Sequence, residues 1–349
     1  MENNNSKVIS ISTATFFKAL IIFLIIVFLY LIKEVIALIF ISLVLASALD
    51  PWVDWFQKRK IPRGLAIVVI YLISLALISA AVILIVPPIT KEVKQIASNF
   101  PVYYDKIFTS LDNFQLKGNP YAQSELQKGL NALSSNLPNA LTNLFSTIFS
   151  FFGGLVSFFL ILVITFYFTV EEEGLKSFLK AICPSKYQPY LAQLIFRIQR
   201  KMGSWLRGQL VLSLIIFSMV FIGLSILGVP YALLLALIAG ILEIIPFIGP
   251  TLAAIPGVFF AFLQSPLLGL LTLGLYLIIQ QAENHLILPK VMSKSVGMNP
   301  LVVIVVMLVG AKLGGVVGAL LAVPVATAGT VFLEDFLERR VNAEDKLAE

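Results

Sequence analysis

The segment ILEIIPFIGP, from Ile241 to Pro250, places one acid and two prolines inside a long apolar run. An ionisable side chain inside a membrane costs about 3 kcal/mol even on lenient insertion scales, and each proline leaves a backbone carbonyl without its usual donor. Broken helices of this kind line polar cavities, where acids and freed carbonyl oxygens contact substrates or cations. The segment therefore predicts a polar site formed by Glu243, Pro246, Gly249 and Pro250. The simpler alternative is a kinked helix whose acid meets water or pairs with a lysine.

A second group of polar side chains closes the next long apolar run, in the sequence QQAENHLILPK. Its acid could exchange protons or bind a cation, and histidine is the residue type that changes charge most readily near neutral pH. The alternative is an ordinary helix end that meets water. As candidates for a substrate or ion pathway, this polar stripe contributes Gln280, Glu283, Asn284, His285 and Lys290.

Glycines form two overlapping GxxxG patterns at Gly310, Gly314 and Gly318. Such patterns allow two helices to approach closely, within one chain or between subunits. Alternatively, Gly314 and Gly315 form the tip of a re-entrant loop beside a permeation path. Lys312 would then be a charge placed at that tip to meet an anion or a carboxylate such as the one in ILEIIPFIGP.

The composition indicates the environment in which these residues act. Of 349 residues, 59% are hydrophobic and only 13% are charged, and the mean hydropathy is +0.96. A soluble domain has about a quarter of its residues charged, whereas several apolar runs here reach the roughly 20 residues that span hydrocarbon. The sequence therefore predicts an all-α polytopic membrane protein whose main partner is the lipid bilayer.

Other chemistries are excluded by what the sequence lacks. A single cysteine, Cys183, excludes a disulfide framework or a cysteine metal site, and a single histidine excludes multi-histidine zinc chemistry. Motifs such as HExxH, GxSxG and the Walker loop are absent. Basic residues gather beside apolar runs, as the positive-inside rule requires, rather than in a nucleic-acid-binding patch. We therefore predict no enzyme activity, cofactor, metal or nucleic-acid partner, and any active transport would use an ion gradient.

The first half of the chain is predicted to hold membrane helices and one external segment. Residues 14–32 and 35–50 form two helices that turn at Lys33–Glu34, and Asp50-Pro51-Trp52 ends the second. The basic loop 58–63 is the strongest cytoplasmic signal. A helix over 65–88 then returns to the outside and ends at Pro87–Pro88.

Residues 89–145 are predicted to be an external amphipathic helical segment. Its leucines recur at steps of three and four, the period of one helix face: Leu126, Leu130, Leu133, Leu137, Leu141 and Leu144. A packed helical cap is one interpretation, and a partner-binding module is the other. Residues 145–170 cross back. An amphipathic stretch within 171–207 follows, which either lies on the inner membrane surface or packs on cytoplasmic neighbours.

The second half is predicted to contain broken segments as well as crossings. Crossings are expected at 208–228, 231–249 and 267–288, with a tight external turn at Gly228–Pro230, a short segment 251–263 broken at Pro256–Gly257, and a helix end at Pro289–Lys290. The last apolar run, 300–332, is too long for one ordinary span. A re-entrant hairpin with its tip at 310–315 keeps both charged ends inside, whereas one tilted helix would put the tail outside.

About eight membrane segments result, some of them broken or re-entrant, with both termini in the cytoplasm. The regions are a disordered N-terminus (1–13), N-terminal membrane helices (14–88), the external segment (89–145), a membrane transport core (146–335) that includes the cytoplasmic linker 171–207, and a charged cytoplasmic tail (336–349).

The order of five sequence blocks resembles the autoinducer-2 exporter (AI-2E) family of bacterial permeases. The blocks are RKIPRGLAIVVIYL, GQLVLSLIIF, LGVPYALLLALIAGILEIIPFIGP, ENHLILPKVMSKSVGMNPLVV and VGAKLGGVVGALLAVPVATA, and the similarity covers residues 15–335. The family's characteristic positions fall on Glu243, Pro246, Gly249, Pro250, Glu283, Asn284, Pro289, Lys290, Gly310, Gly315, Gly318 and Pro324. Asn299 stands where many relatives have a histidine, so a proton-linked role does not carry over to that position.

The resemblance implies a multi-pass secondary transporter of the bacterial inner membrane that assembles as a homo-oligomer. Family members are linked to export of the signalling molecule autoinducer-2 in quorum sensing, to sodium(lithium)/proton antiport and to sporulation-related membrane roles. The first hypothesis is therefore a gradient-driven permease that exports a small polar metabolite such as autoinducer-2. The second is an antiporter for sodium or lithium, and the third is a non-transporting scaffold or regulator acting through 89–145.

For either kind of transporter, the expected site lies where the broken 241–250 segment faces the 280–290 stripe and the glycine hairpin. Glu243 and Glu283 are predicted to be the proton or cation sites. Backbone carbonyls around Ile245–Gly249 are predicted to contact the substrate.

Overall fold

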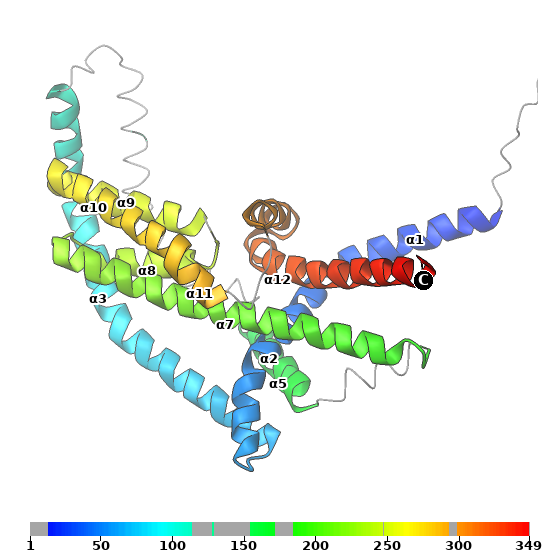
Figure 1. Ribbon diagram of the computed structural model, residues 1–349. Helices are drawn as coiled ribbons and strands as arrows, with labels where there is room; N and C mark the ends of the chain where they lie inside the picture. The colour runs from blue at the N-terminus through cyan, green and yellow to red at the C-terminus, as the bar shows by residue number, and fades with distance from the viewer. Residues whose placement is uncertain are drawn as a thin grey trace, which may run out of the picture.

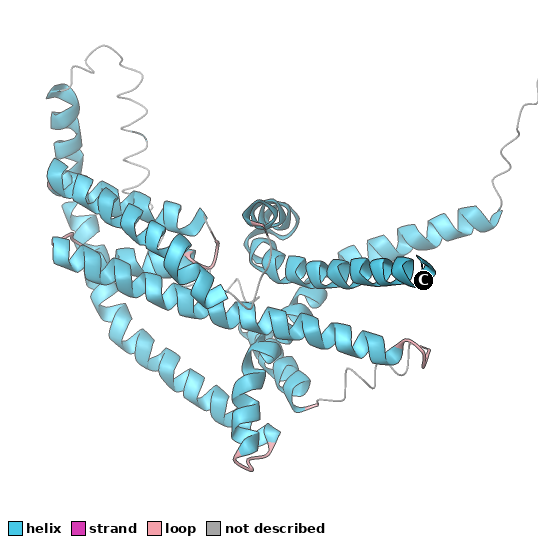
Figure 2. Ribbon diagram, viewed as in Figure 1, coloured by secondary structure: helices cyan, strands magenta, loops and turns pink. Residues whose placement is uncertain are grey.

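The structure is a computed structural model that describes residues 13–113, 128, 154–171, 184–246, 248–292 and 299–348. Within these residues, all regular structure is helical (Figure 2). The helices are α1 (Thr13–Leu31), α2 (Lys33–Lys58), α3 (Arg63–Asn113), α5 (Gly154–Val170), α7 (Gln188–Leu227), α8 (Ala232–Leu242), α9 (Ile248–Gln264), α10 (Pro266–Ala282), the π-helix η2 (Glu283–Ile287), α11 (Leu288–Met292) and α12 (Pro300–Ala348). The predicted leucine face at 126–144 lies outside the described residues.

Helices of membrane-spanning length account for much of this architecture. In the described part of the chain, five helical segments are long and apolar enough to cross a bilayer: Lys33–Lys58, Arg63–Ile96, Gln188–Leu227, Pro266–Met292 and Val317–Asp335. Shorter apolar helices accompany them at Phe16–Leu31, Gly154–Val170, Ala232–Leu242, Gly249–Gln264 and Leu301–Gly315. The predicted fold class, an all-α polytopic membrane protein, is confirmed.

The first two helices meet beside the predicted turn, but the second does not end where the sequence suggested. The break falls at Ile32, next to Lys33. The prediction that Asp50-Pro51-Trp52 ends α2 is wrong, because the helix continues through Pro51 to Lys58. Pro51 has no N–H for the carbonyl of Ser47, four residues earlier. The Arg207 guanidinium on α7 donates to that oxygen instead, at 3.0 Å, so the helix continues without an orphaned carbonyl.

The pair Pro87–Pro88 does not end α3 either, and this prediction is also wrong. The helix runs on to Asn113. Ile89 and Ile96, beyond the prolines, are buried in the apolar core that α3 shares with α7 and α8. Tertiary packing on both sides of the prolines therefore outweighs their local preference to end a helix.

The long helix α7 contacts α2, α8, α10, α11 and α12 (Figure 1). The predicted boundary between an amphipathic stretch ending at 207 and a crossing beginning at 208 is absent, because both belong to one helix of 40 residues. The N-terminal half of α7 packs against α2 and α12, and its C-terminal half packs against α8 and α10. Its apolar residues Met202 and Trp205 are buried. This face therefore packs at least in part on α2 and α12, and its position relative to the inner membrane surface stays a prediction.

A short helical hairpin, α8–α9, replaces the predicted inward crossing over 231–249. The predicted turn at Gly228–Pro230 is present, and Gly228 has the left-handed φ of 70° that favours glycine there. Only 11 residues follow in α8, a rise of about 16 Å against about 30 Å of hydrocarbon. The α9 helix then returns, so that the Phe260 ring contacts the Tyr231 ring at 5.2 Å. The two ends of the hairpin therefore lie together, away from its tip.

Two further predictions about helix ends in this region are wrong. The α9 helix continues through Pro256–Gly257, where the glycine leaves room for the Tyr276 side chain of α10. The helical path after α10 continues past Pro289 to Met292, through the π-helix η2. The predicted end of the 251–263 segment at Gln264–Ser265 is present, because α9 ends at Gln264. Ser265 then caps α10 by accepting a hydrogen bond from the backbone N–H of Leu268 at 3.2 Å.

The α12 helix is a bent pair of helices, as the hairpin interpretation of 300–332 requires. The backbone leaves helical geometry at Gly314 and Gly315, and Gly315 has φ 60° and ψ −142°, a region that is essentially open to glycine alone. Gly310 and Gly318 then meet backbone to backbone, with no space for a Cβ on either. The close-packing role of the GxxxG pattern and the turn at its centre are both observed, and the placement of this hairpin in the bilayer stays a prediction.

Candidate functional site

The tip of the α8–α9 hairpin places Glu243 in the interior. The α8 helix ends at Leu242, and the chain turns through Pro246 before α9 begins. Gly249 lies against the Leu242 carbonyl so closely that a Cβ would clash, which closes the hairpin at its tip. Pro250 falls in the first turn of α9, where a missing N–H leaves no carbonyl unpaired. The Glu243 side chain is 0% exposed.

A glutamine that the sequence interpretation missed holds this tip in place. The Gln209 side chain on α7 donates from Nε2 to the Glu243 backbone carbonyl at 2.6 Å. Gln209 is itself buried, and its Oε1 has no hydrogen-bond partner within the described residues. The available signal was the polar pair Gln209 and Ser213, one helical turn apart in an otherwise apolar stretch.

A second acid reaches the same place from the other side. Glu283 begins the π-helix η2 and is 4% exposed, and its carboxyl group interacts with that of Glu243. Both Glu243 oxygens and Oε2 of Glu283 lack hydrogen-bond partners in the described structure, and no described arginine or lysine forms an ion pair with either acid. One-turn π-helices often occur at functional sites, and nothing in the sequence predicted this one.

Two buried carboxyl groups this close together need a positive charge, either a proton or a cation, to offset their repulsion. Two adjacent carboxylates repel each other in a medium of low dielectric constant, and each is costly to bury without a partner. A shared proton or a bound cation between them relieves both penalties. The arrangement is therefore suited to taking up and releasing one small positive charge.

The other members of the predicted stripe separate from this pair. Gln280 is half-buried near Glu283, whereas Asn284, His285 and Lys290 are exposed. His285 contacts the backbone carbonyl of Gln281 through Nδ1 at 3.1 Å. The helix therefore turns only part of the stripe toward the hairpin tip.

The glycine hairpin of α12 meets the broken segment along its arms and not at its tip. Ile245, in the turn after Glu243, packs against an apolar cluster that includes Trp205, Val303 and Met307. Lys312, two residues before the bend, is exposed, while Glu243 is fully buried. These two side chains therefore do not pair in this structure.

A cavity of about 470 Å³ opens beside the carboxyl pair, between α9 and α10 and against α7. Glu283 and Gln280 line it, together with Tyr276, whose buried hydroxyl group has no hydrogen-bond partner among the described residues. Thr272, one turn away on α10, also has a buried hydroxyl group without a hydrogen-bond partner among the described residues. Neither residue was predicted, because a lone threonine or tyrosine in an apolar helix is usually a packing residue.

A second cavity, of about 490 Å³, lies at the opposite end of α8. Its lining includes Glu92, which accepts a hydrogen bond from the backbone N–H of Leu234 in the first turn of α8 at 2.9 Å. The Tyr103 and Tyr231 hydroxyl groups are 2.7 Å apart. Burial, with the hydrogen bond to Tyr231 as a second cause, raises the pKa of Tyr103 to about 12, so this contact stays uncharged at neutral pH. These contacts attach α3 to the base of the α8–α9 hairpin.

Comparison with known proteins assigns this arrangement to a family. The family model described as AI-2E family transporter matches residues 19–338, which includes every helix that forms the site. The chain belongs to the AI-2E transporter family. The resemblance inferred from the sequence blocks is confirmed, and an AI-2E transporter is a membrane transport protein and not an enzyme.

Curated relatives of this AI-2E transporter cover most of its length. The Bacillus subtilis (strain 168) protein named "Putative transport protein YueF" is 29% identical over 281 residues, covering 77% of this chain and 75% of the relative. A second B. subtilis protein with a name of the same form, YrrI, is 25% identical over 316 residues, covering 88% of each chain. A protein of Halobacillus andaensis named sodium-lithium/proton antiporter is 24% identical over 306 residues, covering 84% of this chain and 87% of the relative.

Proposed function

We propose that this AI-2E transporter is a gradient-driven secondary transporter in which Glu243 and Glu283 form the ion-coupling site. The observation that carries the proposal is the burial of both carboxyl groups side by side at the tip of a broken helix, with no basic partner among the described residues. Burial of this kind is costly and is usually retained in membranes for function. A proton or monovalent cation that enters and leaves this pair would couple the ion gradient to movement of the cargo.

Export of a small polar metabolite such as autoinducer-2 stays the leading prediction for the cargo. A position in the bacterial inner membrane, cytoplasmic termini and homo-oligomeric assembly stay predictions with it. The buried carboxyl pair supports ion coupling whatever the cargo is, so it can be tested before the cargo is known.

Infrared difference spectroscopy of the purified protein in lipid tests the coupling site directly. The wild-type protein should show the carbonyl band of a protonated carboxylic acid, and raising the pH or adding sodium chloride should remove it. In Glu243→Gln and in Glu283→Gln the pH at which the band disappears should shift, and sodium chloride should no longer remove the band, because each variant has only one acid at the site. Glu171→Gln serves as the matched control, since Glu171 is exposed at the end of α5.

The same variants should then be compared in proteoliposomes that carry a pH indicator. Proton movement driven by an opposing ion gradient should decrease at least tenfold in both pair variants and stay unchanged in the control. Wild-type rates in Glu243→Gln, with normal expression and insertion, would remove the carboxyl pair from the mechanism.

Sodium or lithium exchange for protons is the second candidate function, and the oxygens around the pair favour it. Carboxylate and carbonyl oxygens suit hard cations, and the partnerless oxygens belong to three residues that are in contact here, Gln209, Glu243 and Glu283. Among the described residues, no group of three or more acidic, histidine or cysteine side chains could hold a metal ion, so a weakly held monovalent cation fits better than a divalent one. Rescue of a salt-sensitive host without its own antiporters would select this function, and no rescue would favour the metabolite.

A further inference from the structure

The cavity beside the carboxyl pair opens toward the part of the surface that lipid would cover. Its lining includes Ile255 and Phe259 of α9 and Leu273 and Leu277 of α10, which are all exposed on the outside of the molecule. Both helices are apolar, and the segment Pro266–Met292 is long and apolar enough to cross a bilayer. A ligand could therefore enter from the bilayer without passing through water.

The lining of this cavity is strongly uneven in polarity. Its polar lining includes Glu283 and Gln280 near the hairpin tip, and Tyr276 beside Gly257 of α9. The rest is almost entirely aliphatic or aromatic, including Ile216 and Val220 of α7, and none of the described lysines, arginines and histidines lines it. An anion would meet an uncompensated carboxylate there, and a fully polar molecule would lose its hydration along the apolar walls.

We propose that this cavity binds an amphipathic organic cation, with its ammonium group at Glu283 and its apolar body between α9 and α10. The charge of such a ligand supplies what the buried carboxyl pair lacks, and its body matches the apolar lining. The aromatic rings of Tyr276 and Phe259 add contact area for the apolar body. This inference rests on the proposed coupling site and assigns it an amphipathic cation as cargo, in place of the small polar metabolite predicted from the sequence.

Charge balance gives the binding step a measurable signature. When the carboxyl pair shares one proton, entry of a monovalent cation releases that proton to water, and the net charge of the site does not change. When the pair takes up a proton again, its charge falls from −2 to −1, the attraction for the cation weakens, and the cation leaves. The ligand and the proton therefore exchange one for one through the same two side chains.

A set of three probes separates the two parts of the proposed ligand. Benzyltrimethylammonium has both the cationic head and an apolar ring, tetramethylammonium has the head alone, and benzyl alcohol has the ring without charge. Binding to the protein in nanodiscs is measured by isothermal titration calorimetry, with proton release followed in a weakly buffered solution. Benzyltrimethylammonium should bind at least tenfold more tightly than either other probe, with about one proton released per ligand.

Variants of the cavity and of the pair complete the test. Ala254→Phe should fill the cavity and weaken benzyltrimethylammonium binding at least tenfold, because Ala254 lines it half-buried. Leu252→Phe is the matched control on the same helix, since Leu252 is exposed and does not line the cavity. If Ala254→Phe fails to fold, Leu277→Trp narrows the cavity from α10. Glu283→Gln should abolish proton release.

The outcomes distinguish this inference from the coupling proposal. Equal affinity for benzyl alcohol and benzyltrimethylammonium would mean that a lipid chain or another neutral apolar molecule occupies the cavity, and would overturn the inference. Proton release by sodium or tetramethylammonium that Ala254→Phe leaves unchanged would retain the coupling site but overturn the cavity as the cargo site. Absence of proton release with every cation would overturn both.

Discussion

At the scale of single residues, Glu243 owes its position to backbone contacts and not to a charged partner. Gly249 closes the hairpin beneath it, and Gln209 binds its carbonyl. Among the described residues, nothing forms a hydrogen bond with the side chain that would do the chemistry, while the backbone that carries it is fixed on two sides. Rigid support around a reactive group is what keeps such a group in a productive geometry.

Replacement of Gly249 by alanine should therefore destabilise the hairpin tip. The new Cβ would overlap the Leu242 carbonyl, and relief of such an overlap costs about 1–3 kcal/mol. The thermal unfolding midpoint should fall, and proton exchange should fall with it. Gly274→Ala is the matched control, because a Cβ on that α10 glycine meets nothing within 4 Å and should stabilise the helix by about 0.5–1 kcal/mol. Equal midpoints for the two variants would contradict the close contact.

Replacement of Gln209 by leucine should uncouple the tip from α7. The Glu243 carbonyl would lose its 2.6 Å donor, and an unpaired buried acceptor costs about 1–3 kcal/mol. We expect a lower unfolding midpoint and impaired proton exchange in proteoliposomes. Gln281→Leu makes the same change at an exposed position on α10 and should leave both quantities near wild type. Wild-type exchange in Gln209→Leu would show that the clamp has no part in transport.

At the scale of helices, the sequence predicted glycine turns well and proline ends poorly. The turns at Gly228 and at Gly314–Gly315 appear where predicted, because positive φ or a tight backbone contact needs glycine. The ends predicted at Pro51, Pro87–Pro88 and Pro256 do not occur. A helix continues through a proline when another donor or a packed neighbour lies nearby in space. The sequence alone does not show which residues are neighbours in space.

The candidate site shows the same division. Glu243 and Glu283 could be predicted individually, since an acid in an apolar run stands out without any structure. Their meeting could only be expected in outline, because the length of α8 and the π-turn set the distance between them. Gln209 comes from a helix that precedes both along the chain, and its role depends on the tertiary contact alone.

A double-mutant cycle can test the account of the helix through Pro51. Arg207→Met should destabilise the protein because the Ser47 and Ala48 carbonyls lose their guanidinium donor. In a Pro51→Ala background the cost should be smaller by about 1 kcal/mol, since the new alanine N–H can bond the Ser47 carbonyl. Chemical unfolding in micelles measures the coupling. Pairing Arg207→Met with Pro256→Ala should give additive effects, because that proline lies on α9 and not on α2, whose carbonyls Arg207 binds.

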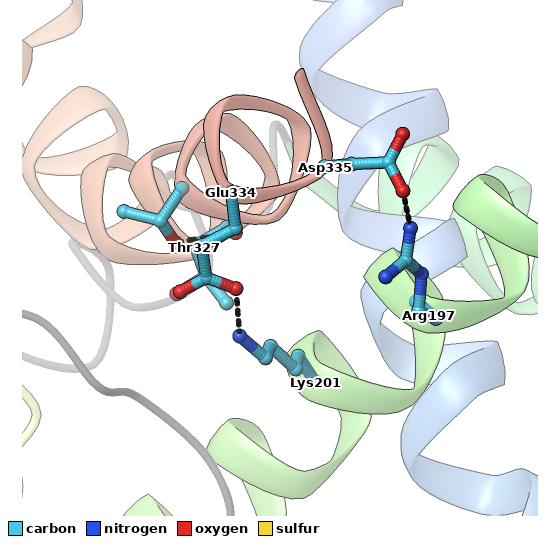
Figure 3. Close-up of polar contacts among 6 residues, drawn as sticks. Arg197, Lys201, Thr327, Glu334 and Asp335 are labelled. Carbon is cyan, nitrogen blue, oxygen red and sulfur yellow. Dashed lines mark hydrogen bonds and ion pairs between the residues drawn. The ribbon is translucent and has the colours of Figure 1, made fainter. Parts of the chain in front are cut away.

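At the scale of the whole molecule, the two halves of α7 pack on different groups of helices through different kinds of contact. Its C-terminal half is embedded in the apolar core with α8, α9 and α10. Its N-terminal half holds α12 through a smaller apolar cluster and through ion pairs on one helix face, Arg197 with Asp335 and Lys201 with Glu334 (Figure 3). An ionic contact can break and re-form at lower cost than a packed core can, so α12 is the element best suited to move during transport.

Charge reversal across this contact should loosen α12 without disturbing the carboxyl pair. Asp335→Arg places two cations together, and the loss of a charge-assisted hydrogen bond costs about 1.5 kcal/mol or more, which corresponds to about tenfold in an opening equilibrium. Hydrogen exchange of α12 amides near residue 335 should accelerate by that factor, while exchange in α8–α10 stays at the wild-type rate. In the double variant Asp335→Arg/Arg197→Asp, the opposite charges face each other again, and the hydrogen-exchange rate of α12 should return to within about threefold of the wild-type rate.

A matched control lies at another ion pair. Asp54→Arg disrupts the 2.6 Å contact with Arg63, which lies between α2 and α3, and should leave α12 exchange unchanged. Acceleration throughout the protein in Asp335→Arg, or no recovery in the double variant, would mean that the pair is part of the general fold. Selective loosening accompanied by a changed rate of proton exchange in proteoliposomes would instead link α12 movement to the cycle. The link is physically direct, because Ile245 in the turn after Glu243 packs against the arms of the same hairpin.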